Sequence, residues 1–98
     1  MEAIVCIIER GKADAVVKDA VKAGAKGATI FYGRGGGEQT FSFFHSLNVA
    51  PSKEVIIILA SNEEVDKIFD AVAASAKVHE KGKGIVFTVP VGRNSLTE

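Results

Sequence analysis

The sequence is short of cysteine and proline and has no excess of charge of either sign. Its 98 residues include one cysteine and two prolines, and 12 Lys and Arg residues balance 12 Asp and Glu residues. With Cys6 alone, neither an internal disulfide nor a cysteine-based zinc site can form. Without a basic excess, the chain lacks the attraction to phosphate backbones that is typical of nucleic-acid binders. We therefore expect no nucleic-acid partner.

Long apolar runs are also missing. The longest ones, Ala3–Ile8 and Val55–Ala60, are far shorter than the roughly 18 residues needed to cross a bilayer. No basic leader precedes a signal-like segment. These features predict a cytoplasmic protein that does not insert into a membrane, built as a single domain over residues 1–98.

Hydrophobic periodicity predicts strands and helices in alternation. Two segments have apolar residues at helical spacing, and the second of them starts with a capping box formed by Ser61 and Glu64. Four β-branched runs have the composition of strands. The expected order is strand 3–8, helix 12–23, strand 28–32, strand 53–60, helix 61–76 and strand 85–89.

This order predicts an α+β fold, the ferredoxin-like βαββαβ sandwich. Right-handed crossovers give a four-stranded antiparallel sheet with both helices on one face. The strands at 3–8 and 53–60 are apolar at nearly every position, so both faces of the sheet need cover and the helices supply only one. We therefore expect a homo-oligomer whose sheets face one another.

The loop 33–52 between the second and third strands is long for a compact domain, which makes it a candidate for function. It contains Phe41, Phe43 and Phe44, which form either a local cluster that pins the loop or an exposed contact for a partner. We also expect a flexible tail over residues 92–98.

Glycine-rich segments are the best candidates for a binding site. Gly33–Gly37 surrounds Arg34, and Lys81–Gly84 alternates lysine with glycine. Bare backbone amides beside cationic side chains are suited to phosphate. Alternatively, these two segments bind nothing and are a flexible hairpin tip and a tight turn. Neither the mononucleotide nor the dinucleotide loop motif is present.

Catalytic arrangements are not recognisable. His45 and His79 have no serine, cysteine or carboxylate at a catalytic spacing, and Cys6 reads as a small buried hydrophobe. We interpret His45 as a loop residue and His79 as a solvated turn residue. The chain is therefore not expected to be an enzyme.

The segment Gly82-Lys83-Gly84-Ile85-Val86-Phe87-Thr88-Val89-Pro90-Val91 resembles the PII signal-transduction proteins and their PII-like relatives. The resemblance covers the chain from Ala3 to about Val91. Its other anchors are Ala23-Gly24, Gly27-Ala28-Thr29 and the loop glycines Gly35 and Gly37.

The resemblance implies a homotrimer with an adenine nucleotide (ADP, AMP or ATP) in each cleft between subunits. Thr29 would lie by the base and ribose, and Gly82 and Gly84 would wrap the phosphates. The remaining implied site residues are Gly35, Gly37 and Gln39 beside the cleft, and Arg34 and Lys83 as a source of positive charge. The loop would contact a regulated partner, either a membrane transporter or a protein of nitrogen or carbon metabolism.

The sequence departs from the PII pattern at several charged positions. Ile85 replaces the lysine after the Gly-x-Gly turn, Glu38 replaces an arginine in the loop, and Arg93 alone remains of an arginine pair. Tyr32 lies in a strand, so no loop tyrosine is available for modification. These departures favour the PII-like subgroup. The alternative function is a divalent-cation-binding trimer of the cation-tolerance type, which shares this fold.

Overall fold

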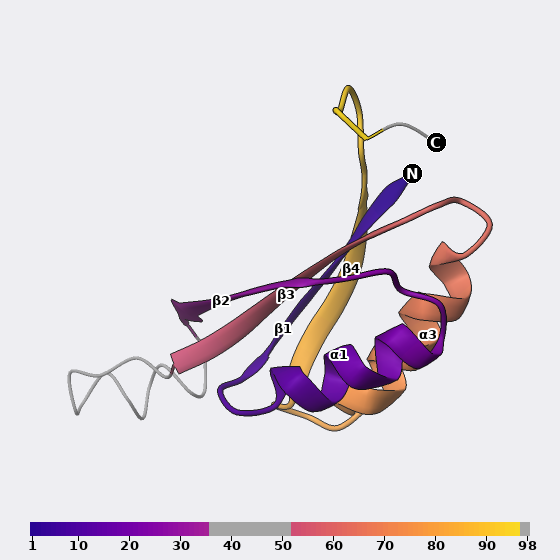
Figure 1. Cartoon of the computed structure of the whole chain (residues 1–98). Helices are drawn as coiled ribbons and strands as arrows, with labels where there is room; N and C mark the ends of the chain where they lie inside the picture. Colours follow the sequence, from indigo (N-terminus) through magenta and orange to yellow (C-terminus); the bar gives the residue numbers. More distant parts are fainter. Residues whose placement is uncertain (36–51, 97–98) are drawn as a thin grey trace.

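The computed structural model describes residues 1–35 and 52–96 of the chain (Figure 1). The elements are β1 (Glu2–Glu9), α1 (Ala13–Lys22), β2 (Thr29–Arg34), β3 (Ser52–Ala60), α3 (Val65–Ala76) and β4 (Gly84–Pro90). The expected βαββαβ order is confirmed, and the strand ends differ from the expected ones by at most two residues. Because β2 extends to Arg34, the segment that joins it to β3 is shorter than the expected loop 33–52.

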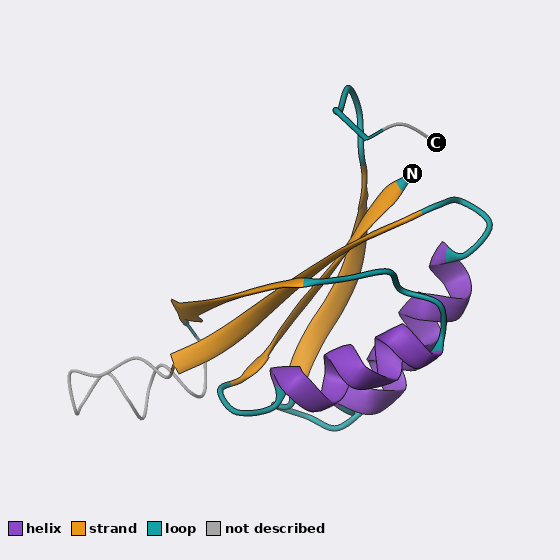
Figure 2. Cartoon of the chain, in the orientation of Figure 1, coloured by secondary structure: helices purple, strands orange, loops and turns teal. Residues whose placement is uncertain are grey.

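The four strands form one antiparallel sheet in the order β2-β3-β1-β4. Both helices cover the same face of this sheet (Figure 2). The ferredoxin-like α+β fold is therefore confirmed. Within the described ranges, no helix is long and apolar enough to cross a lipid bilayer.

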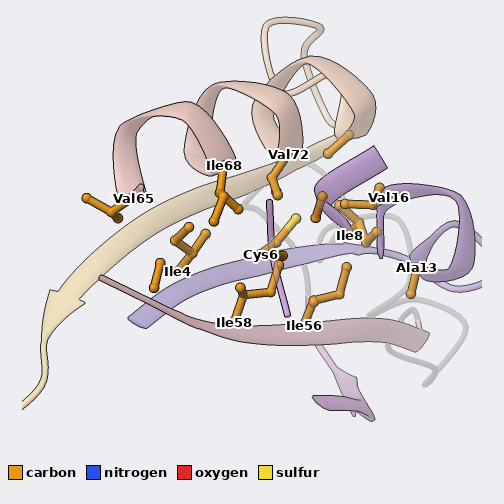
Figure 3. Packing of buried hydrophobic residues seen from close by; sticks show 14 residues of the cluster. Ile4, Cys6, Ile8, Ala13, Val16, Ile56, Ile58, Val65, Ile68 and Val72 are labelled. Carbon is orange, nitrogen blue, oxygen red and sulfur yellow. The ribbon is translucent and has the colours of Figure 1, made fainter. Parts of the chain in front are cut away.

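The core lies between the sheet and the helices (Figure 3). Alternate residues of β1 and β3 point into it, since Ile4, Ile8, Ile56 and Ile58 are almost fully buried. Cys6 lies among them, and burial raises the pKa of its thiol to about 11. The interpretation of Cys6 as a small buried hydrophobe is confirmed.

The start of α1 depends on a residue from β3. The N-cap residue of α1, Lys12, makes no side-chain capping bond. Instead, Glu54 Oε1 accepts hydrogen bonds from the Gly11 amide at 2.6 Å and the Ala13 amide at 3.0 Å. Glu54 is itself buried, so its negative charge lies at the positive end of the α1 dipole.

Helix α3 does not begin as the sequence predicted, and the expected capping box is wrong. Ser61 Oγ donates a hydrogen bond to Glu64 Oε1 at 3.3 Å rather than capping a helix amide. The backbone carbonyl of Ser61 accepts from the amides of Glu64 and Val65 instead. Because this turn satisfies the early amides, the helix starts at Val65.

The other face of the sheet is not covered by any part of the chain that the structure describes. Strand register aligns its side chains in rows that cross the sheet. The rows are Phe31-Val55-Ile7-Ile85, Thr29-Ile57-Val5-Phe87 and Leu59-Ala3-Val89. Several of these side chains are exposed, including Phe31, Ile85, Phe87 and Val89. We call this surface the open sheet face.

Candidate functional site

Thr29 is the first residue of β2 and lines a cavity of about 790 Å³. The α1–β2 connection, the last residues of β3 and the start of α3 form its walls. Ile57 and Leu59 supply an apolar wall beside Thr29, whereas Lys26, Glu63 and Glu64 bring charge to it. A cavity of this size is within the range of small-molecule sites, about 300–1,000 Å³.

Sequence reasoning identified Thr29 but missed its neighbours in this cavity. Ile57 is the direct cross-strand partner of Thr29, so both side chains project from the open sheet face. The apolar run Val55–Ala60 was the available signal, but it does not alternate, so it does not show which of its residues face the cavity. The strand register needed to use it is a property of the fold.

Arg34 and Gly35 lie where β2 ends. Arg34 is the last strand residue and Gly35 the first one after it. Arg34 and Thr29 are five positions apart in the strand, so their side chains project from opposite faces. The predicted site residues Gly37 and Gln39 lie outside the described residues, as do Glu38, His45 and the three phenylalanines of the loop.

The segment before β4 has the backbone that its glycines suggested. Gly82 has a φ of +81° and Gly84 a φ of +153°, both in the region that favours glycine. A Cβ at Gly84 would lie 2.5 Å from the carbonyl oxygen of Ile7, so β1 and β4 approach too closely there for a side chain. His79, a few residues earlier, is exposed in a turn as interpreted from the sequence.

Lys83 lies between these two glycines and is only loosely paired. Its Nζ is 4.0 Å from Glu9 Oε1, and both side chains are nearly half exposed. An ion pair of this kind contributes little to stability, and solvent competes for it. The lysine can therefore turn to an anion at small cost.

The structure does not bring the predicted site residues together within one chain. Thr29, Arg34 and Gly35 belong to β2, at one edge of the sheet, and Gly82, Lys83 and Gly84 lie at the start of β4, at the other edge. Three strand spacings separate the two edges, which is about 14 Å. The predicted site residues of one chain therefore fall into two groups, the half-sites of our prediction, which we call the β2 edge and the β4 edge.

Metal ligands do not gather in the described part of the chain. No three His, Cys, Asp or Glu side chains within residues 1–35 and 52–96 are placed to hold one ion. Arg34 and Lys83 bring positive charge to the two edges, whereas Glu9 lies beside Lys83 and Glu63 and Glu64 line the Thr29 cavity. Arg34 and Lys83 are the groups at these edges that suit an anion.

We compared the sequence with protein families and with curated proteins. No curated protein matches the chain. A family model described as nitrogen regulatory protein P-II matches residues 1–95. Proteins of that family are signalling proteins rather than enzymes, and they are typically trimers that bind regulated partners. Because the match extends over almost the whole sequence, the chain belongs to the nitrogen regulatory protein P-II family.

Proposed function

We propose that the chain is a PII-like signalling protein, a homotrimer that binds an adenine nucleotide in the clefts between its subunits. Occupancy of these clefts regulates a partner protein through the segment between β2 and β3. The partner is a membrane transporter or a protein of nitrogen or carbon metabolism.

The separation of the two half-sites is the observation that carries this proposal. A nucleotide that contacts both Thr29 and the Gly82–Gly84 segment needs these two groups close together, and one sheet holds them apart. A second copy of the chain resolves the difficulty when its β4 edge meets the β2 edge of the first. Contacts between two different surfaces generate a ring when the rotation closes.

The open sheet face supports the same assembly. Its rows of valine, isoleucine and phenylalanine form an apolar surface of the kind that marks interaction sites. Ile85 belongs to this surface, in the same row as Ile7. A copy of the chain that covers the open sheet face also brings its edges near those of its neighbours.

The chemistry of the two edges is suited to a nucleotide. At the β2 edge, the apolar wall of Ile57 and Leu59 provides a surface for a base, and the Thr29 hydroxyl provides a polar contact. At the β4 edge, the Gly82–Gly84 backbone and Lys83 are suited to phosphate. Gly35, Gly37 and Gln39 flank the cleft in this proposal, and Arg34 adds charge at the end of β2.

The proposed output is a shift in conformational population. A nucleotide that draws the two edges together favours some conformations of the segment between β2 and β3 over others. A partner that binds one of these conformations is then recruited or released as the nucleotide changes.

The test combines mass determination with ligand titration. Light scattering gives the mass of the assembly, and thermal denaturation with AMP, ADP, ATP, cyclic AMP and cyclic di-AMP, with and without magnesium, finds the ligand. A ligand that binds only the folded protein must raise the melting temperature. We expect a trimer with at least one saturable nucleotide.

Substitutions then place the ligand. Thr29→Ala and Lys83→Ala change opposite edges, and both should lower nucleotide affinity measured by calorimetry if the cleft unites them. Lys67→Ala, at an exposed position of α3, is the control and should leave affinity unchanged. A stable monomer, or a trimer that no nucleotide stabilises, would contradict the proposal. Retention of a divalent ion after dialysis would favour the cation-binding alternative.

A further inference from the structure

Arg10, in the turn between β1 and α1, lies over the ring of Tyr32. The guanidinium carbon of Arg10 is 4.7 Å from the centroid of this ring, within the range of a cation–π contact. A contact of this length attracts the guanidinium to the ring face, and a guanidinium on a ring face can still donate hydrogen bonds at its rim. The side chain of Tyr32 is 64% exposed, so the pair lies at the surface.

Arg34 lies on the same face of β2 as Tyr32. The two residues are two positions apart in the strand, which places their backbones about 7 Å from each other. Arg34 is also exposed. In Figure 1 the ends of β2 and β3 that flank residues 36–51 extend past the helices, which leaves this face open.

Neither arginine has an acidic partner within residues 1–35 and 52–96. The salt bridge found in these ranges joins Lys83 to Glu9. Glu54 is the cross-strand neighbour of Tyr32, but it is buried and its Oε1 accepts the Gly11 and Ala13 amides. Among the described residues, neither guanidinium group thus has a counter-ion, and both lie near the Tyr32 side of β2.

Glu54 also fixes the turn that carries Arg10. Its bond to the Gly11 amide holds the residue next to Arg10, and its bond to the Ala13 amide holds the first residue of α1. The position of Arg10 is therefore set from two sides, by the Tyr32 ring and by the Glu54 carboxylate. Preorganised guanidinium groups are strong ligands for phosphate because they donate paired hydrogen bonds.

We propose that Arg10 and Arg34 form a binding site for a phosphate-class oxyanion on the helix-side face of β2, with Tyr32 positioning Arg10. The Thr29 side chain projects from the other face of β2, and its cavity lies at the opposite end of the strand from Arg34, so this is a second site. The oxyanion is either free phosphate or a phosphoryl group of a nucleotide that reaches around the end of β2. The inference rests on the proposed function only in the second case.

The test is calorimetric titration of the full chain with inorganic phosphate. Arg10→Gln and Arg34→Gln should each weaken phosphate binding by about tenfold or more, because a hydrogen bond to a charged group is lost. Tyr32→Leu keeps both charges but removes the ring, and it should give a smaller loss. Lys67→Gln is the control for a general change in charge and should bind phosphate like the unmodified protein.

Competition identifies the source of the oxyanion. If AMP displaces phosphate and Arg10→Gln weakens AMP but not adenosine, the site binds a nucleotide phosphate. If AMP and phosphate bind independently, the site binds the free anion. Unchanged phosphate affinity in both arginine variants, or no phosphate binding at millimolar concentration, overturns the assignment. Failure of every nucleotide would contradict the proposed function, while a phosphate site sensitive to Arg10 would stand.

Discussion

Glu54 is a single side chain on which the start of a helix depends. Replacing it with alanine leaves the Gly11 and Ala13 amides without their acceptor. We expect Glu54→Ala to lower the free energy of unfolding by about 1–3 kcal/mol, the cost of one unpaired buried donor, because the Ala13 amide is buried whereas water can reach Gly11. Chemical denaturation measures this loss.

Glu54→Gln separates the hydrogen bonds from the charge. The amide oxygen of glutamine can accept both bonds, so the loss should be limited to the charge–dipole contribution, about 0.3–1 kcal/mol. If Glu54→Gln destabilises the protein as much as Glu54→Ala, the charge of the carboxylate and not its hydrogen bonds holds the turn.

Cys6 makes stability depend on pH in the alkaline range. Burial raises the pKa of its thiol from 9.0 to about 11. Between these values the unfolded chain releases the proton while the folded chain keeps it, so the unfolded state binds fewer protons and the free energy of unfolding falls as pH rises. Below pH 9 the thiol of Cys6 is protonated in both states, so its contribution to the free energy of unfolding is fully present.

The alanine variant isolates this effect. Denaturation at several pH values should show a steeper alkaline decline for the unmodified protein than for Cys6→Ala, because lysine and tyrosine ionisations are common to both. Parallel pH profiles for the two proteins would show that the thiol ionises equally in both states.

The role of a residue could be predicted from the sequence where it depends on neighbouring residues, but not where it depends on contacts with distant ones. The buried character of Cys6 followed from its apolar neighbours in sequence. Glu54 gave no such signal, because its partners Gly11 and Ala13 come from a turn more than 40 positions away. Arg10 and Tyr32 likewise meet only once β2 lies beside β3.

At the scale of elements, the two ends of α3 are stabilised differently, by the Ser61 turn at the start and by a left-handed residue at the end. Its C-cap residue Lys77 has a φ of +56°, a left-handed conformation that costs a non-glycine residue about 1–2 kcal/mol. Lys77→Gly should therefore raise the free energy of unfolding by about 0.5–1 kcal/mol after the entropy cost of glycine. Thermal and urea denaturation measure the change.

A substitution to glycine one turn earlier should instead lower the free energy of unfolding. Ala74 is exposed inside α3, and Ala74→Gly should cost about 1 kcal/mol because glycine disfavours the helix. A destabilised Lys77→Gly protein would show that the lysine side chain contributes more than the strained backbone costs.

Element types and order were predictable because hydrophobic period and glycine punctuation are local. The start of α3 was not, since Ser61 satisfies the early amides through its backbone carbonyl rather than through its side chain. For the site, the sequence predicts Thr29 and the Gly82–Gly84 segment, and this stays a prediction. It did not show that they lie at opposite edges, because strand order is set by the packing of the whole chain.

At the scale of the whole molecule, the proposed assembly depends on the open sheet face. Phe87 is 39% exposed on this face, at the middle of the edge strand β4, and Phe87→Glu places a charge that must be desolvated when copies associate. We expect this variant to lose the trimer in light scattering. Val21→Glu is the matched control, because Val21 is 51% exposed on α1, in the helix layer. A Phe87→Glu protein that keeps the trimer would place the interface elsewhere.

The order β2-β3-β1-β4 has a consequence for mixed assemblies. If each cleft takes its β2 edge from one subunit and its β4 edge from the next, a Thr29 variant and a Lys83 variant damage different halves of it. Co-expression of the two would create trimers in which a sound β2 edge meets a sound β4 edge in some clefts. Two weakly binding proteins would then complement each other, and some clefts in the mixture would bind nucleotide more tightly than either parent does.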